Sequence, residues 1–244
     1  MELVVIESGS EGNGYAMIGS GETLLIEAGV RFSEYQRALG KDVFNVIGCL
    51  ITHEHGDHAL YAKQVTQHGI PIFCSRGTAV YIKSKHNILI LEAGKAYSIG
   101  SFKVVPFKVN HDATEPFGYL INHNDCGNIL FITDSGDCNY KFSELSTAII
   151  ECNYEDIRIN ENIERKIVDG KRASRTRKAH LSLSQVKTFV ERNYNNSLMR
   201  IVLIHTSCDN LNSEVAKREV YNVSHVPVYI AERGLRISIG KEPF

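Results

Sequence analysis

Ten short segments typical of β-strands recur along almost the whole chain, and they restrict the possible folds more than any other feature. Each is apolar or alternates apolar with polar residues, the pattern of a buried or half-buried strand. The expected strands cover residues 3–6, 15–18, 23–27, 46–52, 102–109, 117–121, 128–134, 147–151, 201–205 and 226–231. So many strands require extensive β-sheet.

Four segments between these strands have helical spacing of their apolar residues. They cover residues 32–39, 58–68, 184–194 and 213–221. Gly40 and Gly69 follow two of them as terminators, and Ser182 with Gln185 has the spacing of a capping box. Strands that are partly adjacent and partly separated by helices predict an α/β fold with mixed sheets covered by helices. Because no linker or repeat interrupts the pattern, we expect one domain over residues 1–244.

Charge and hydropathy exclude several functional classes. The chain has 27 Lys and Arg against 28 Asp and Glu, which argues against a protein that coats nucleic acid non-specifically, so phosphate contacts would be local. Its apolar runs are far too short to span a bilayer, and the N-terminus lacks signal-peptide features, so we expect a cytoplasmic protein without a membrane partner. Six scattered cysteines, with no C-x-x-C pair, are expected in the core or in loops.

The strongest chemical signal is an H-x-H-x-D-H motif in residues 52–58, which we call the metal turn. It lies where a buried strand is expected to end and a helix to begin. His53 and His55 would point to the same side because strand side chains repeat every two residues, while Asp57 and His58 leave from the turn. This concentration of ligand-type side chains predicts a site for two adjacent metal ions.

The metal turn and three later motifs resemble the metallo-β-lactamase superfamily of hydrolases. His111 follows one expected strand, Asp134 ends another, and His205 ends the apolar run 201–204, in the order in which that family carries its remaining ligands. Residues 8–13 and 25–29 extend the resemblance toward the N-terminus, except that Glu27 stands where the family usually has a supporting aspartate.

The resemblance implies a four-layer αβ/βα sandwich with two mixed β-sheets flanked by helices. It also implies one metal held by His53, His55 and His111, a second held by Asp57, His58 and His205, and Asp134 shared between them. Nitrogen and oxygen ligands without thiolate suit Zn²⁺, with Mn²⁺ as the alternative. Two such ions would let a metal-bridged hydroxide carry out hydrolysis.

The C-terminal half resembles the small exonuclease-type members of the superfamily, the YycJ- and WalJ-like group, and is similar to the nuclease branch that includes RNase Z. In that branch a Glu and a His serve proton transfer, which implies catalytic roles here for Glu151 and His180 beside Asp57. A histidine oriented by a carboxylate can protonate the departing alkoxide near neutral pH. The alternatives are that His180 is a second-metal ligand or caps the helix beginning near Ser182, and that Glu151 is a surface carboxylate.

Substrate contacts are expected mainly from a basic run over residues 165–178. Its seven basic residues, against one acid, lead into His180, and we assign substrate binding to six residues within or near this half: Arg175, Arg177, Lys178, Asn153, Ser207 and Asn210. The alternative for the run is a solvated loop. No inserted segment is large enough for a cap domain or a protruding substrate-binding arm. The remaining histidines are expected at the surface or at helix ends, namely His68, His86, His123 and His225.

These observations predict a metal-dependent hydrolase that cleaves phosphodiester bonds in DNA or RNA. One alternative is a small-molecule hydrolase of the same fold that acts on a cyclic phosphodiester, a thioester or a lactone. Another is a metal-binding partner module without turnover.

Overall fold

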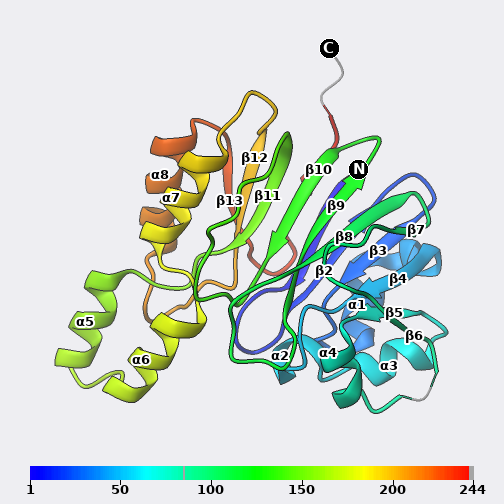
Figure 1. Ribbon diagram of the computed structural model, residues 1–244, viewed down its shortest axis with the longest axis horizontal. Helices are drawn as coiled ribbons and strands as arrows, with labels where there is room; N and C mark the ends of the chain where they lie inside the picture. The colour runs from blue at the N-terminus through cyan, green and yellow to red at the C-terminus, as the bar shows by residue number, and fades with distance from the viewer. Residues whose placement is uncertain (85, 242–244) are drawn as a thin grey trace. The chain divides into compact units, whose positions relative to one another are not determined.

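The computed structural model describes residues 1–84 and 86–241, which fall into two compact units. Unit 1 comprises residues 1–108, 113–128 and those from 232 onward, and unit 2 comprises residues 109–112 and 129–231. Figure 1 shows the course of the chain through both. The prediction of a single domain stays a prediction, while the expected α/β class with two mixed sheets flanked by helices is confirmed.

Unit 1 contains a seven-stranded mixed sheet in the order β14-β1-β2-β3-β4-β5-β6. Its strands are β1 (Glu2–Glu7), β2 (Gly14–Ile18), β3 (Thr23–Ile26), β4 (Val46–Leu50), β5 (Ile72–Cys74), β6 (Ile88–Ile90) and β14 (Arg236–Ser238). The first three pair antiparallel, whereas β3 to β6 run parallel. Because parallel strands are connected by crossovers, the helices of unit 1 lie between them in sequence.

The helices of unit 1 are short and pack around this sheet (Figure 1). They are α1 (Phe32–Leu39), the 3₁₀ helix η1 (Gly40–Asn45), α2 (Gly56–Ala59), α3 (Ala62–Gln67) and α4 (Arg76–Tyr81). Phe32, Tyr35 and Leu39 of α1 join a core with Val65 of α3 and Ile72 of β5. Unit 1 also contains three antiparallel strands of the second sheet: β7 (Tyr97–Ile99), β8 (Phe102–Lys108) and β9 (Phe117–His123).

Unit 2 holds the strands in the order β13-β12-β11-β10. They are β10 (Gly127–Ile132), which begins at the boundary of the units, β11 (Leu145–Glu151), β12 (Arg200–Ile204) and β13 (Val228–Ile230). Every residue of β11 and β12 is buried, as expected for parallel strands with neighbours on both sides. Helices α7 (Leu183–Asn193) and α8 (Ser213–Ser224) cover these strands (Figure 1).

Helix α7 begins with the capping box predicted at Ser182 and Gln185. The Ser182 side chain accepts the Gln185 backbone N–H, and the Gln185 side chain accepts that of Ser182. Val186, Phe189 and Val190 then follow at helical spacing and are buried. This cap fixes where the chain leaves the segment that carries His180.

The remaining helices of unit 2 form a pair, α5 (Asp156–Glu164) and α6 (Gly170–Ala179), which lies beside the strands of its unit (Figure 1). The pair has its own small core of Tyr154, Ile159, Val168 and Ala173. Most of the basic run is helical, which contradicts the alternative of a loop, while the expectation that no segment forms a protruding substrate-binding arm stays a prediction. None of the helices in residues 1–84 and 86–241 is long and apolar enough to cross a membrane.

Candidate metal centre

The metal turn of unit 1 follows β4, which ends at Leu50, and runs into α2, which begins at Gly56. Its ligand-type side chains converge: His53 Nε2 lies 3.1 Å from His55 Nδ1, and His58 Nε2 lies 3.3 Å from Asp57 Oδ2. His53 and His58 are buried, whereas His55 and Asp57 are partly exposed. The metal turn therefore lies between a strand and a helix, as predicted. Its four ligand-type side chains lie close together in two pairs.

Glu27 supports the metal turn, although the resemblance led us to expect an aspartate at this position. The carboxylate is fully buried and accepts hydrogen bonds from Thr52 Oγ1 at 2.6 Å and from the Thr52 backbone N–H at 3.4 Å. His58 Nδ1 lies 3.5 Å from its Oε1, which leaves Nε2 as the nitrogen for a metal. Burial raises the pKa of the Glu27 carboxyl above its ordinary value, although His58 and Thr52 oppose the rise.

Close backbone approach also holds the metal turn, and a glycine makes it possible. A Cβ atom at Gly29 would lie 1.7 Å from the Asp57 carbonyl oxygen, so no other residue fits there without backbone movement. The same carbonyl accepts the backbone N–H of Asn13 at 2.7 Å. The Asn13 side chain is buried, with Nδ2 3.3 Å from His58 Nε2. The sequence analysis did not assign Asn13 to the site.

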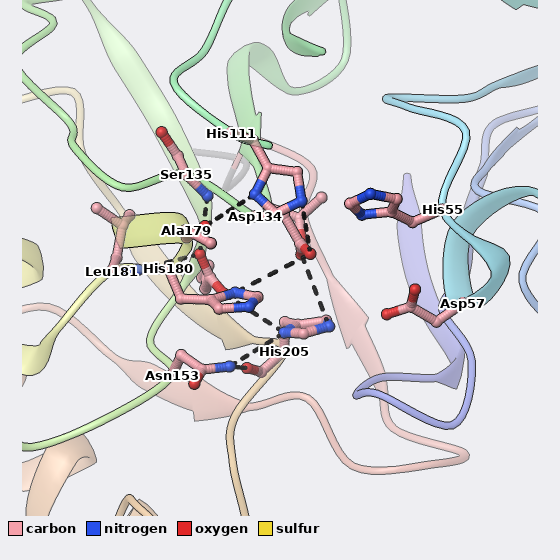
Figure 2. Close-up of polar contacts among 12 residues, drawn as sticks. His55, Asp57, His111, Asp134, Ser135, Asn153, Ala179, His180, Leu181 and His205 are labelled. Carbon is pink, nitrogen blue, oxygen red and sulfur yellow. Dashed lines mark hydrogen bonds and ion pairs between the residues drawn. The ribbon is translucent and has the colours of Figure 1, made fainter. Parts of the chain in front are cut away.

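In unit 2 the side chains of His111, His180 and His205 surround the carboxylate of Asp134 (Figure 2). His111 Nε2 and His205 Nε2 each lie 3.6 Å from an Asp134 oxygen, and His180 Nδ1 lies 4.0 Å from it. Thr133 Oγ1 donates a 2.8 Å hydrogen bond to Asp134 Oδ1. A buried carboxylate ringed by imidazoles is a donor set that suits a divalent metal.

Hydrogen bonds to the far side of each ring orient two of these imidazoles. His111 Nδ1 donates to the Ala179 carbonyl at 2.9 Å, so its lone pair is on Nε2, which faces Asp134. His205 Nδ1 lies 3.4 Å from Glu151 Oε1, and Asn153 Nδ2 donates to the His205 carbonyl at 3.0 Å. Both rings therefore present Nε2 toward the same carboxylate.

Two residues at strand ends, Asp134 and His205, have an unusual backbone conformation that helps to orient their side chains. Asp134 has φ 36° and His205 has φ 49°, a left-handed conformation that non-glycine residues adopt rarely. Each follows the end of a buried strand, β10 for Asp134 and β12 for His205. Strained residues of this kind concentrate at functional sites, because the surrounding structure must hold them in place.

Glu151 organises the unit 2 site from the end of β11. Its side chain is 0% exposed, which excludes the alternative of a surface carboxylate. Oε1 lies 2.6 Å from His180 Nδ1, and Oε2 accepts the backbone N–H groups of Ser135 at 3.1 Å and Leu181 at 3.2 Å. One carboxylate thus holds the His180 ring, the segment after Asp134 and the segment after His180.

Glu151 and His180, which we call the acid pair, shift each other's pKa. Burial lowers the pKa of His180, but the charge of Glu151 and their hydrogen bond raise it more, so the net value is above the ordinary one. Burial likewise raises the pKa of Glu151, but the charge and hydrogen bond of His180 bring it below its ordinary value. The pair therefore favours a protonated imidazole beside an ionised carboxylate. Since Ser182 and Gln185 cap α7, His180 does not serve as that cap.

The six residues assigned to substrate binding have different surroundings. Asn153 and Asn210 are buried and bonded within unit 2, Asn153 to His205 and Asn210 to Asn162 and Ser207. Arg177 faces α5, where its Nη2 donates to Asn160 Oδ1 at 2.6 Å. Arg175 and Lys178, by contrast, line a pocket with His111. Their assignments all stay predictions; Asn153 adjoins the expected metal ligand His205, and Arg175 and Lys178 adjoin His111.

Among the remaining histidines, one differs from expectation. His68 and His225 are exposed caps at the ends of α3 and α8, and His86 is exposed, as predicted. His123 instead is buried at the end of β9, with Nε2 2.9 Å from Ser101 Oγ. The prediction of a surface position was wrong there, because the ring packs 4.9 Å from the Phe102 ring while satisfying its polar atoms.

Comparisons with known proteins agree with this arrangement. A family model described as the β-lactamase superfamily domain matches residues 22–205. The chain is 27% identical to the exodeoxyribonuclease YycJ of Bacillus anthracis over 91% of this chain and 89% of that protein. Among solved structures, the metallo-β-lactamase fold protein YhfI of Bacillus subtilis matches with a TM-score of 0.72 and 16% identity, covering 97% of this chain and 98% of that one. The short form of human tRNase Z matches with a TM-score of 0.65 and 18% identity, covering 99% and 100%.

Proposed function

The chain belongs to the metallo-β-lactamase superfamily, and from this premise we propose that it is a metal-dependent phosphodiesterase that cleaves nucleic acid, in particular an exonuclease that acts on DNA. The choice of DNA is supported by the similarity to an exodeoxyribonuclease along nearly the whole of both chains. The choice of a phosphodiester is supported by the chemistry of unit 2. Fold alone would support neither choice.

The observation that carries the proposal is the acid pair. His180 lies 2.6 Å from a fully buried glutamate and 4.0 Å from Asp134, and its side chain is 20% exposed. A binding module would need metal ligands but no imidazole held protonated at the edge of the ligand cluster. Cleavage of a phosphodiester does need one, because the departing alkoxide must be protonated.

The donor sets of both units fit divalent metal ions of the Zn²⁺ or Mn²⁺ kind. In unit 2, His111 Nε2 and His205 Nε2 each lie 3.6 Å from an Asp134 oxygen, and in unit 1 the metal turn offers imidazole and carboxylate donors only. We propose that two ions are held by the seven residues His53, His55, Asp57, His58, His111, Asp134 and His205. When bound, such ions supply an activated water and neutralise charge on the phosphate.

The side chains around the metal ligands have separate tasks. Glu151 keeps a proton on His180 Nδ1, so the proton for the leaving oxygen comes from Nε2 of the same ring. Asn153 and Ala179 hold His205 and His111 through their backbone and ring contacts. Asp57, partly exposed at the start of α2, is proposed both as a ligand and as a residue that orients the attacking water.

The test is release of nucleotides from end-labelled DNA and RNA of the same sequence, with and without chelator. We expect mononucleotides from DNA, loss of activity with chelator, and recovery when Zn²⁺ or Mn²⁺ is returned. Faster hydrolysis of RNA would correct the choice of nucleic acid. Hydrolysis confined to cyclic phosphodiesters, thioesters or lactones would replace the nuclease by a small-molecule hydrolase.

A further inference from the structure

One face of α6 carries basic and hydroxyl side chains into a pocket. Lys171, Ser174, Arg175 and Lys178 are spaced as i, i+3, i+4 and i+7, which places them along a single side of the helix. They line a pocket of about 600 Å³ together with Asn110, His111 and Asp112 of the same unit. The basic run is therefore divided by the helix into residues that face a cavity and residues that do not.

Contacts at α6 show which groups of this face are available to a ligand. Arg175 Nε lies 3.0 Å from Asp112 Oδ2, a contact that orients the guanidinium and leaves its two terminal nitrogens for another partner. Lys171 and Lys178 have no ion pair within residues 1–84 and 86–241. The backbone N–H groups of Lys171 and Arg172 are already used by the Asp169 side chain, so side chains must do the binding.

Charge in the pocket favours an anion. Three cations line it against a single carboxylate, that of Asp112, and the overall chain carries a formal charge of −1, so this concentration of positive charge is local. The neighbouring Arg177 does not contribute, because Asn160 and Asp156 of α5 hold it on the other side of the helix. A solvated basic face would need no pocket and no selection of residues by helical spacing.

We propose that this pocket binds a backbone phosphate of a nucleic acid strand, adjacent to the phosphodiester that is cleaved. The inference rests on the proposed nuclease function and adds to it a second phosphate subsite. His111 lines the pocket and is also a proposed metal ligand, so a phosphate held by Lys171, Arg175 and Lys178 lies next to the reacting group. The subsite makes a polynucleotide a better substrate than a diester with a single phosphate.

The test compares two triple variants that remove the same charge. One changes Lys171→Ala, Arg175→Ala and Lys178→Ala, and the control changes the exposed residues Lys141→Ala, Arg192→Ala and Lys217→Ala, which lie outside the basic run and outside the pocket. Binding of a fluorescein-labelled single-stranded DNA is measured by anisotropy in chelator over a series of salt concentrations. We expect the pocket variant to bind roughly 10- to 100-fold more weakly, with a salt slope smaller by about 0.7, the contribution of one single-strand phosphate.

Turnover separates this inference from the proposed function. The pocket variant should raise the KM for DNA by a larger factor than the KM for bis(4-nitrophenyl) phosphate, which has a single phosphate and cannot fill a second subsite, and the control should match the parent on both substrates. Equal affinity and salt slope in the two variants would overturn the subsite even if the parent is a nuclease. A parent that binds DNA through the pocket but releases no nucleotides would instead overturn the proposed function and leave the subsite supported by binding.

Discussion

The metal turn of unit 1 and the acid pair of unit 2 each rest on a fully buried glutamate, but the two glutamates have different neighbours. Glu27 contacts a hydroxyl, a backbone N–H and His58, and burial raises its pKa. Glu151 contacts His180 at 2.6 Å, and His180 brings the pKa of Glu151 below its ordinary value. The difference supports separate roles, in which Glu27 orients His58, a proposed metal ligand, whereas Glu151 also raises the pKa of His180.

The largest effect is expected from Asp134→Ala. The Asp134 carboxylate is close to His111, His180 and His205, so its loss should remove both ions and reduce hydrolysis to background. Metal content measured by elemental analysis would check this, with the exposed carboxylate variant Asp209→Ala as control. An Asp134→Ala protein that keeps two ions would contradict the shared role of this carboxylate.

The next largest effect is expected from His180→Ala, which removes the proposed proton donor. Cleavage of DNA should slow by about 10²–10⁴-fold with both ions retained. Hydrolysis of a diester with a good leaving group should recover much of the lost rate, because such a group leaves without protonation. If the variant instead lost an ion, His180 would be a metal ligand, as the alternative from the sequence holds. His205→Ala provides the contrast, since it should lose metal.

A matched pair, Glu27→Gln and Glu151→Gln, separates the two glutamates directly. Loss of Glu27 should weaken metal binding by roughly 10- to 100-fold without any dependence on the leaving group. Loss of Glu151 should reduce turnover by a similar factor and lower the pKa of His180, because the carboxylate is what raises it. A general acid acts when protonated, so the alkaline limb of the pH–rate profile should move to lower pH for Glu151→Gln alone.

A shift of the alkaline limb of the pH–rate profile in Glu27→Gln as well would contradict the distinction between the two glutamates. Glu151 Oε1 also lies 3.4 Å from Nδ1 of His205, a proposed metal ligand, so metal content and rate must be measured together for Glu151→Gln.

The smallest effects are expected at two glycines that permit close backbone approach, one in each region. A Cβ atom at Gly29 would lie 1.7 Å from the Asp57 carbonyl oxygen, and one at Gly136 would lie 1.9 Å from that of Lys178. Each Gly→Ala change should destabilise the protein by about 1–3 kcal/mol, measured by denaturant unfolding. Gly56→Ala and Gly170→Ala are the controls, since their Cβ atoms would meet nothing within 4 Å. Equal stability in test and control would mean that these backbones move without cost.

All ten strands expected from the sequence are present. Nine of them have four or more residues, and β13, which has three, lies within the longer apolar run 226–231 from which it was predicted. The four strands that were missed, β5, β6, β7 and β14, have three residues each, too few for any periodicity. Helix α6 was missed for a different reason. Ala173 and Ala179 are its only buried residues, so it has no apolar stripe. The N-cap residue Asp169 is the one sequence signal that indicates this helix.

Some site residues could be predicted from a local sequence pattern, whereas others depend on how distant segments pack together. The metal turn could be predicted because its residue types and spacing are rare, and the structure places its side chains together in unit 1. Burial of Glu151 and the contact of Asn13 with His58 depend on which segments pack together, and no local pattern encodes that. Which cations of the basic run face a pocket likewise required the helix to be known.

The two ends of the α5–α6 pair are clasped together. Asn153 N–H donates to the Leu181 carbonyl at 2.9 Å, and Leu183 N–H donates to the Tyr154 carbonyl at 2.8 Å, so the chain leaves and returns at one place. The entropic cost of closing a loop between two such hydrogen-bonded ends grows only slowly with the length of the loop. The length of residues 156–179 can therefore change during evolution or by design at little cost in chain entropy, as long as the end of α6 keeps the contacts of Lys178 and Ala179 with Gly136 and His111.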